Sequence, residues 1–183
     1  MWNIPNIITA FRIFLIPIFL VIFYLPYSWA FFGAAFVFWL AAVTDVLDGY
    51  LARKLKQSTP FGAFLDPVAD KVMVSVALIV LVEHYQSIYI TIPAVLIISR
   101  EVIISALREW MAEQGKRGSV AVSQLGKIKT AAQMLSIMGL TWQFDTWMTY
   151  LSYACLYLAT VLTLWSMVQY LQAAWSDLSK KAG

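Results

Sequence analysis

The fold-deciding stretch is residues 45–70, DVLDGYLARKLKQSTPFGAFLDPVAD, in which four aspartates adjoin long apolar runs. Asp45 and Asp48 lie near the end of one apolar run, and Asp66 and Asp70 lie near the start of the next. On helices, the spacings of three and four residues put each pair on one face. The short polar stretch between the pairs predicts two antiparallel neighbouring helices whose acidic faces meet.

Carboxylates inside a membrane segment are energetically costly and usually mark a functional site. Four of them at close range repel one another unless a cation lies between them. Hard divalent cations such as Mg²⁺ or Mn²⁺ suit a site made only of oxygen ligands. The sequence therefore predicts a divalent-metal site formed by Asp45, Asp48, Asp66 and Asp70.

The composition is that of a membrane protein. Of the 183 residues, 61% are hydrophobic and 13% are charged, and the mean hydropathy is +0.74. Soluble domains are about half apolar and about a quarter charged. The apolar residues form long blocks without alternation, which favours helices over a β-barrel. We therefore predict an all-α integral membrane protein with a single domain over residues 1–183.

Six transmembrane helices are expected, preceded by an interfacial N-terminal segment, because a spanning helix needs about 20 apolar residues. Thr59 and Pro60 open the third helix as an N-cap followed by proline at the first helical position. The expected ranges are 6–25, 31–54, 61–84, 90–113, 124–142 and 147–175.

The basic residues indicate the orientation of the chain. Lys and Arg cluster after the second helix, between the fourth and fifth helices and at the C-terminus, whereas the three connections on the other side carry none. Positive charge marks the cytoplasmic side, so both termini and the aspartates are expected there. Basic residues at the ends of apolar segments fit anionic headgroups and phosphorylated substrates, and no nucleic-acid partner is expected.

Small residues and an arginine accompany the first two aspartates. Gly49 and Ala52 let a bulky group approach the backbone beside the metal site, although each alone also fits ordinary helix packing. Arg53 follows at the membrane boundary, where a guanidinium pairs with phosphate oxygens. Metals, an arginine and open backbone together suit a pyrophosphate.

The spacing D-x-x-D-G-x-x-A-R-x(8)-G-x-x-x-D-x-x-x-D resembles the signature of the CDP-alcohol phosphotransferases, and every fixed position is present. The resemblance implies a fold of six transmembrane helices, two bound divalent ions and a homodimer. It implies transfer of a substituted phosphoryl group from a CDP-linked donor to an alcohol, with release of CMP. It also assigns the last aspartate, Asp70, the role of general base.

Residues 3–12, 61–71, 99–109 and 126–130 resemble members of this family from bacteria that use CDP-diacylglycerol as donor and sn-glycerol 3-phosphate as acceptor. The resemblance implies phosphatidyl transfer at the bacterial cytoplasmic membrane. A related enzyme with another acceptor, inositol phosphate or serine, is the alternative. The residues expected to bind the donor are Asn6, Thr9, Arg12, Gly49, Ala52, Arg53 and Gly62.

Four basic residues fit an acceptor that is already phosphorylated. Arg100 and Arg108 lie two turns apart on the fourth helix, and Lys127 and Lys129 begin the fifth. A dianionic phosphate needs such cations, whereas a neutral acceptor does not. The two lysines would also satisfy the positive-inside rule alone.

Glu101 bears on two of these assignments. Pairing with Glu101 or Glu109 would account for Arg100 without a substrate. Glu101 is also the one nearby rival to Asp70 as general base, and we expect it to be tied to Arg100 or a lysine.

A divalent-cation transporter is the competing class, because intramembrane acids also mark ion paths. A transporter should carry acids near mid-membrane and paired repeats, whereas these aspartates share one end and the chain has no repeat. His84, the single histidine, falls on the opposite side, which excludes Ser-His-Asp catalysis. Cys155 is expected to pack within the sixth helix.

Overall fold

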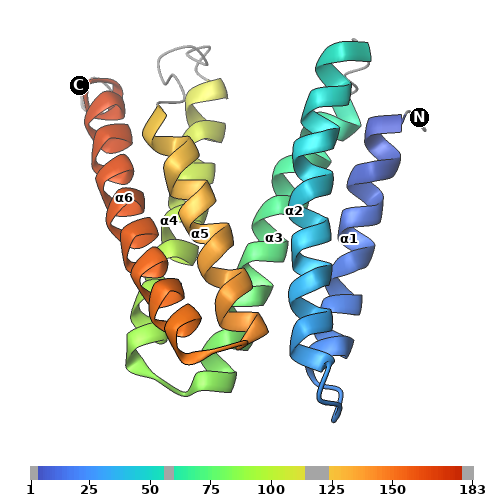
Figure 1. Ribbon diagram of the computed structural model, residues 1–183. Coiled ribbons are helices and arrows are strands. Elements are labelled where there is room, and N and C mark those ends of the chain that lie inside the picture. The colour runs from blue at the N-terminus through green and yellow to red at the C-terminus, as the bar shows by residue number, and fades with distance from the viewer. Residues whose placement is uncertain (1–3, 56–59, 114–123, 179–183) are drawn as a thin grey trace.

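The computed structural model describes residues 4–55, 60–113 and 124–178, with most of their side chains, and these ranges form six helices. Successive helices run in alternating directions, so α1 begins and α6 ends at the same end of the bundle (Figure 1). The helices are α1 (Ile4–Phe23), α2 (Ala30–Leu55), α3 (Pro60–Tyr85), α4 (Ile88–Glu113), α5 (Gln124–Trp142) and α6 (Thr146–Leu178).

These helices confirm the all-α prediction, and the described ranges contain no strand. The observed ends lie close to the predicted ones, and α3 begins at Pro60, whose fixed backbone angle suits the first helical position. The largest difference is at α6, which continues to Leu178. The interfacial segment expected before the first helix is reduced, since α1 already begins at Ile4 and residues 1–3 lie outside the described part.

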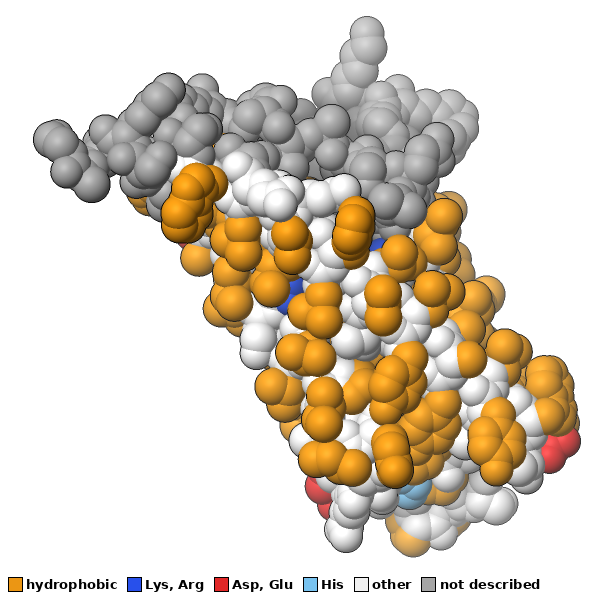
Figure 2. All heavy atoms as spheres, turned by 90° about the vertical axis from the view of Figure 1, so that its left-hand side faces the viewer, with side chains coloured by type: hydrophobic (Ala, Val, Ile, Leu, Met, Phe, Trp, Pro, Cys, Tyr) orange, Lys and Arg blue, Asp and Glu red, His pale blue; other side chains and the backbone are white. Residues whose placement is uncertain are grey.

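Three helices contain stretches long and apolar enough to cross a membrane: Ala30–Leu47, Ile88–Glu113 and Thr146–Gln172. The apolar stretch of α1 is shorter, Ile7–Phe23. Apolar side chains cover most of the described surface on the side of the bundle where α6 lies (Figure 2). The protein is therefore a membrane protein, and six spans stay a prediction.

The packing of the helices differs in one respect from the expectation. α1 packs along both α2 and α3, and α5 packs along both α6 and α2, whereas α2 and α3 touch each other only slightly. Over the residues that the structure describes, α1 thus packs more extensively against α2 and against α3 than these two helices pack against each other. Buried core side chains on this side of the bundle include Phe19, Phe38 and Leu78.

Gly139 lets α5 approach α6 closely, and this contact yields a prediction on stability. A Cβ at residue 139 would overlap the hydroxyl of Ser152 and lie 3.2 Å from its Cβ. We expect Gly139→Ala to lower the free energy of unfolding by about 1–3 kcal/mol through overpacking, measured by thermal unfolding in detergent. Ser152→Ala should recover part of this loss when combined with Gly139→Ala. An unchanged or higher melting temperature for Gly139→Ala alone would contradict the contact.

Candidate functional site

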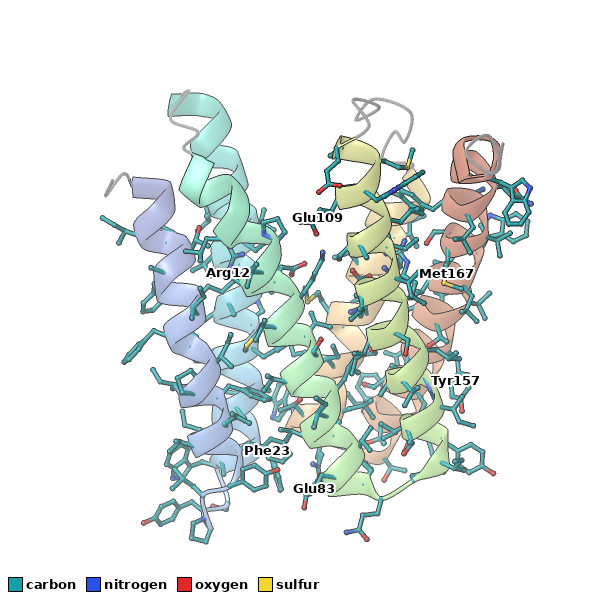
Figure 3. All side chains as sticks on the ribbon, turned by 180° about the vertical axis from the view of Figure 1, so that it is seen from behind. Arg12, Phe23, Glu83, Glu109, Tyr157 and Met167 are labelled. Atoms are coloured by element: carbon teal, nitrogen blue, oxygen red, sulfur yellow. The ribbon has the colours of Figure 1, made fainter. Side chains whose placement is uncertain are left out.

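The acidic end of α2 is bound to α1 by an ion pair. Arg12 Nη1 lies 2.7 Å from Asp45 Oδ1. The Arg12 side chain is only 2% exposed, whereas the Asp45 side chain is 44% exposed. Figure 3 shows Arg12 in the interior of the bundle, between α1 and its neighbours. A buried arginine thus holds one oxygen of a carboxylate that remains accessible.

Asp70 of α3 lies near this pair. Arg12 and Asp70 line one small cavity of about 10 Å³, together with Phe38 and Ala41 of α2. Asp45 and Arg12 are both close enough to Asp70 to act on its charge. The structure therefore brings Asp45 and Asp70 to one region, as the sequence predicts, with Arg12 as an additional member.

A divalent metal fits the chemistry of this region. Asp45 and Asp70 offer oxygen ligands only, which suits hard divalent cations. The side chains of Asp48 and Asp66 lie outside the described part, although their positions are one turn from Asp45 and Asp70 on the same helices. Within the described residues no three potential metal-ligating side chains come together, so the four-carboxylate site stays a prediction.

The residues expected to bind the donor are only partly described. Thr9 lies one turn before Arg12 on α1 and is fully buried, and Gly62 near the start of α3 is also buried. The side chains of Asn6, Ala52 and Arg53 and the surroundings of Gly49 lie outside the described part.

A second charged group joins α4 to α5. Arg100 Nη1 lies 2.9 Å and Lys129 Nζ lies 2.7 Å from the same oxygen, Oε1 of Glu101. Arg100 and Lys129 are 7% and 8% exposed, respectively. Such buried charges require pairing, and Glu101 supplies it to both. This confirms that Glu101 is tied to Arg100 and to a lysine, which disfavours it as the general base.

Two hydroxyl groups of α6 complete this group, and sequence analysis missed both. Arg100 Nη2 donates to Ser166 Oγ at 2.8 Å, and Arg108 Nη2 donates to the Tyr170 hydroxyl at 2.6 Å. Ser166 and Tyr170 are four residues apart and share one face of α6. This polar spacing in an otherwise apolar helix is the signal that could have revealed them.

The region of Arg12, Asp45 and Asp70 adjoins the basic group, which consists of Arg100, Arg108 and Lys129. Lys71, next to Asp70, donates a hydrogen bond to the hydroxyl of Ser105 on α4. The charges of Lys129 and Asp70 also act on each other. Asp70 therefore lies within electrostatic reach of the Arg12–Asp45 ion pair and also of Lys129 and Glu101. The side chain of Lys127 lies outside the described part.

The charge balance of the basic group favours an anion. Arg100, Arg108 and Lys129 carry three positive charges, and the negative charge of Glu101 neutralises one of these charges. The two positive charges in excess match a phosphate monoester, which carries nearly two negative charges at neutral pH. The arrangement can therefore bind a phosphorylated molecule beside a carboxylate.

At the opposite end of the bundle, His84 makes packing and hydrogen-bond contacts. His84 packs edge-on against Phe23 and Tyr85, and its ring nitrogen lies 2.9 Å from the Gln143 amide. Phe23 and Glu83 mark this end in Figure 3, far from Arg12 along the helices. The expected separation of His84 from the aspartates is confirmed.

An acidic region that suits divalent ions, next to a basic region that suits phosphate, defines a helical membrane protein of phosphoryl-transfer type. The family model described as CDP-alcohol phosphatidyltransferase matches residues 2–165, and the chain belongs to this family, which generally uses divalent metal ions.

Close relatives cover nearly the whole chain. The CDP-diacylglycerol–glycerol-3-phosphate 3-phosphatidyltransferases of Shigella flexneri serotype 5b (strain 8401) and Escherichia coli (strain K12) are each 58% identical to it over 177 residues. The match covers 97% of this chain and 97% of each relative. The chain is therefore similar to these enzymes over nearly their full length.

Proposed function

We propose that the protein transfers the phosphatidyl group of CDP-diacylglycerol to sn-glycerol 3-phosphate, giving phosphatidylglycerophosphate and CMP. The observation that carries this proposal is the basic group of Arg100, Arg108 and Lys129 beside Asp70. The activity printed for relatives that are 58% identical over nearly the full chain supports it.

An apolar groove supports a lipid-linked donor. A pocket of about 670 Å³ lies between α2 and α5, lined mainly by apolar side chains such as Trp39, Val43 and Leu47. Asp45 lies at the same pocket. A molecule with apolar chains and a charged headgroup fits this combination, with its chains along α2 and α5 and its headgroup toward the aspartates.

The donor headgroup would lie against the signature residues. Two ions, Mg²⁺ or Mn²⁺, held by Asp45, Asp48, Asp66 and Asp70 would neutralise the pyrophosphate charge when bound. The residues proposed to contact the donor itself are Asn6, Thr9, Arg12, Gly49, Ala52, Arg53 and Gly62.

Asp70 is proposed as the general base. The acceptor hydroxyl attacks the phosphorus that carries the diacylglycerol group, the bond from this phosphorus to the CMP oxygen breaks, and CMP leaves. The hydroxyl proton passes to the Asp70 carboxylate. Arg100, Arg108, Lys127 and Lys129 hold the acceptor phosphate, so that the hydroxyl points toward Asp70.

The proposed setting is the cytoplasmic membrane of a bacterium. All six helices would span it as one domain over residues 1–183, with both termini and the active site on the cytoplasmic side, and the chain would form a homodimer. The clustering of Lys and Arg at the end of the bundle that holds the aspartates supports this orientation.

An acceptor panel tests the proposal. Purified protein in mixed micelles with CDP-diacylglycerol and Mg²⁺ receives glycerol 3-phosphate, glycerol, serine or inositol phosphate. We expect CMP release and a new lipid, identified by mass spectrometry, with glycerol 3-phosphate only. Equal turnover with serine or glycerol would contradict a phosphate-binding acceptor site, and preference for inositol phosphate would identify a related synthase instead.

Lys129→Ala provides a test of the acceptor site by mutation. Glu101 retains its pairing with Arg100 in this variant, so the local structure should persist. Loss of one charged contact to phosphate should raise the KM for glycerol 3-phosphate about tenfold or more, with little change in the KM for CDP-diacylglycerol. Lys129→Arg, which keeps the charge, is the matched control. Wild-type acceptor KM in Lys129→Ala would remove Lys129 from the site.

A further inference from the structure

Tyr170 of α6 contacts both arginines of the basic group. Its hydroxyl accepts a hydrogen bond from Arg108 at 2.6 Å. The guanidinium carbons of Arg100 and Arg108 lie 5.6 and 5.2 Å from the centre of its ring. One side chain from a helix outside the signature thus bridges two cations that lie two turns apart on α4.

The chemistry of this contact differs from that of Glu101. A glutamate neutralises the cations that it pairs with, whereas a tyrosine hydroxyl and ring orient a guanidinium without cancelling its charge. Arg108 is exposed and has a long side chain, so an anchor on another helix is what restricts its rotamers. The hydrogen bond uses one of five guanidinium N–H groups, which leaves Arg108 able to bind phosphate as well.

We propose that Tyr170 is a positioning residue that sets acceptor affinity by holding the guanidinium groups of Arg108 and Arg100 in place for the acceptor phosphate. This inference rests on the proposed function. Ser166, one turn earlier on α6, anchors Arg100 in the same way. Both arginines of α4 are thus anchored to one face of α6.

Two substitutions separate the hydroxyl from the ring. Tyr170→Phe should raise the KM for glycerol 3-phosphate about three- to tenfold, and Tyr170→Leu should raise it further because the ring is also lost. The kcat and the KM for CDP-diacylglycerol should stay within about twofold of the wild type. A merely structural role would lower kcat and affect both substrates.

Tyr157→Phe is the matched control on the same helix. The Tyr157 hydroxyl donates to the backbone oxygen of Tyr89 at 3.1 Å, and Figure 3 places Tyr157 well below Met167, toward the end of the bundle away from the arginines. This variant loses one hydroxyl contact between α6 and α4, as Tyr170→Phe does, but should keep the wild-type KM for glycerol 3-phosphate.

A double-mutant cycle tests whether Tyr170 acts through Arg108. In the Arg108→Ala background, Tyr170→Phe should cause no further rise in the KM for glycerol 3-phosphate. A further rise would indicate direct contact with the acceptor and overturn the positioning role. Wild-type KM in both Tyr170→Phe and Tyr170→Leu would also overturn it, while leaving the proposed function intact. Wild-type protein without glycerol 3-phosphate-dependent CMP release would overturn the proposed function, and this inference with it.

Discussion

Asp70→Asn is expected to lower kcat by about 10²–10⁴, the usual cost of losing a general base, with CDP-diacylglycerol binding nearly unchanged. Asparagine is almost isosteric with aspartate but does not take up the proton of the attacking hydroxyl. Asp70 suits this role because it shares a small cavity with Arg12, the partner of Asp45, and lies within electrostatic reach of Lys129. Initial rates of CMP release and equilibrium binding of the donor measure the two effects separately.

Asp145→Asn is the control for this substitution. Asp145 accepts a hydrogen bond from the backbone N–H of Thr146 at the start of α6, at the opposite end of the bundle, and asparagine caps a helix about as well as aspartate. Activity should therefore be unchanged. If Asp70→Asn loses divalent-ion and donor binding along with turnover, Asp70 acts as a metal ligand only and its proposed second role as the base is wrong. Full activity would mean that the base lies elsewhere.

Asp45→Asn is expected to reduce activity by about 10²-fold or more at a fixed divalent-ion concentration, because it weakens an ion site. It also removes the carboxylate charge that pairs with Arg12 at 2.7 Å. Direct measurement of Mn²⁺ binding should show weaker affinity, and higher Mg²⁺ should recover part of the activity.

Arg12→Lys separates the two consequences of losing the Asp45 charge. This variant keeps a positive charge beside Asp45 and should retain most of the Mn²⁺ affinity. Wild-type Mn²⁺ affinity in Asp45→Asn would show that Asp45 serves only to hold Arg12. Asp48→Asn and Asp66→Asn are expected to behave like Asp45→Asn.

Much of the fold could be predicted because the apolar runs and their interruptions determine helix ends. Pro60 illustrates this, since its ring suits the first turn of α3. The relation between α2 and α3 could not be predicted in the same way. It depends on how the apolar face of α1, with residues such as Phe19, packs against both, and such side-to-side choices carry no local sequence signal.

The site residues also fall into those that the sequence predicts and those that depend on tertiary packing. Fixed spacing brought Asp45 and Asp70 into the prediction, and membership of a transferase family now favours an enzyme over a cation transporter. The ion pair of Arg12 with Asp45 depends on tertiary packing that the sequence does not reveal. Tyr170 was missed for another reason: a tyrosine toward the end of an apolar helix resembles an ordinary interfacial residue.

Isotope labelling shows which oxygen atom forms the new bond to phosphorus. In the proposed reaction, the acceptor's own hydroxyl oxygen attacks the donor phosphorus. With glycerol 3-phosphate carrying ¹⁸O in its primary hydroxyl, every molecule of lipid product should contain one ¹⁸O atom, and the CMP should contain none. Unlabelled lipid product, or ¹⁸O in CMP, would contradict direct attack by the acceptor and the role proposed for Asp70.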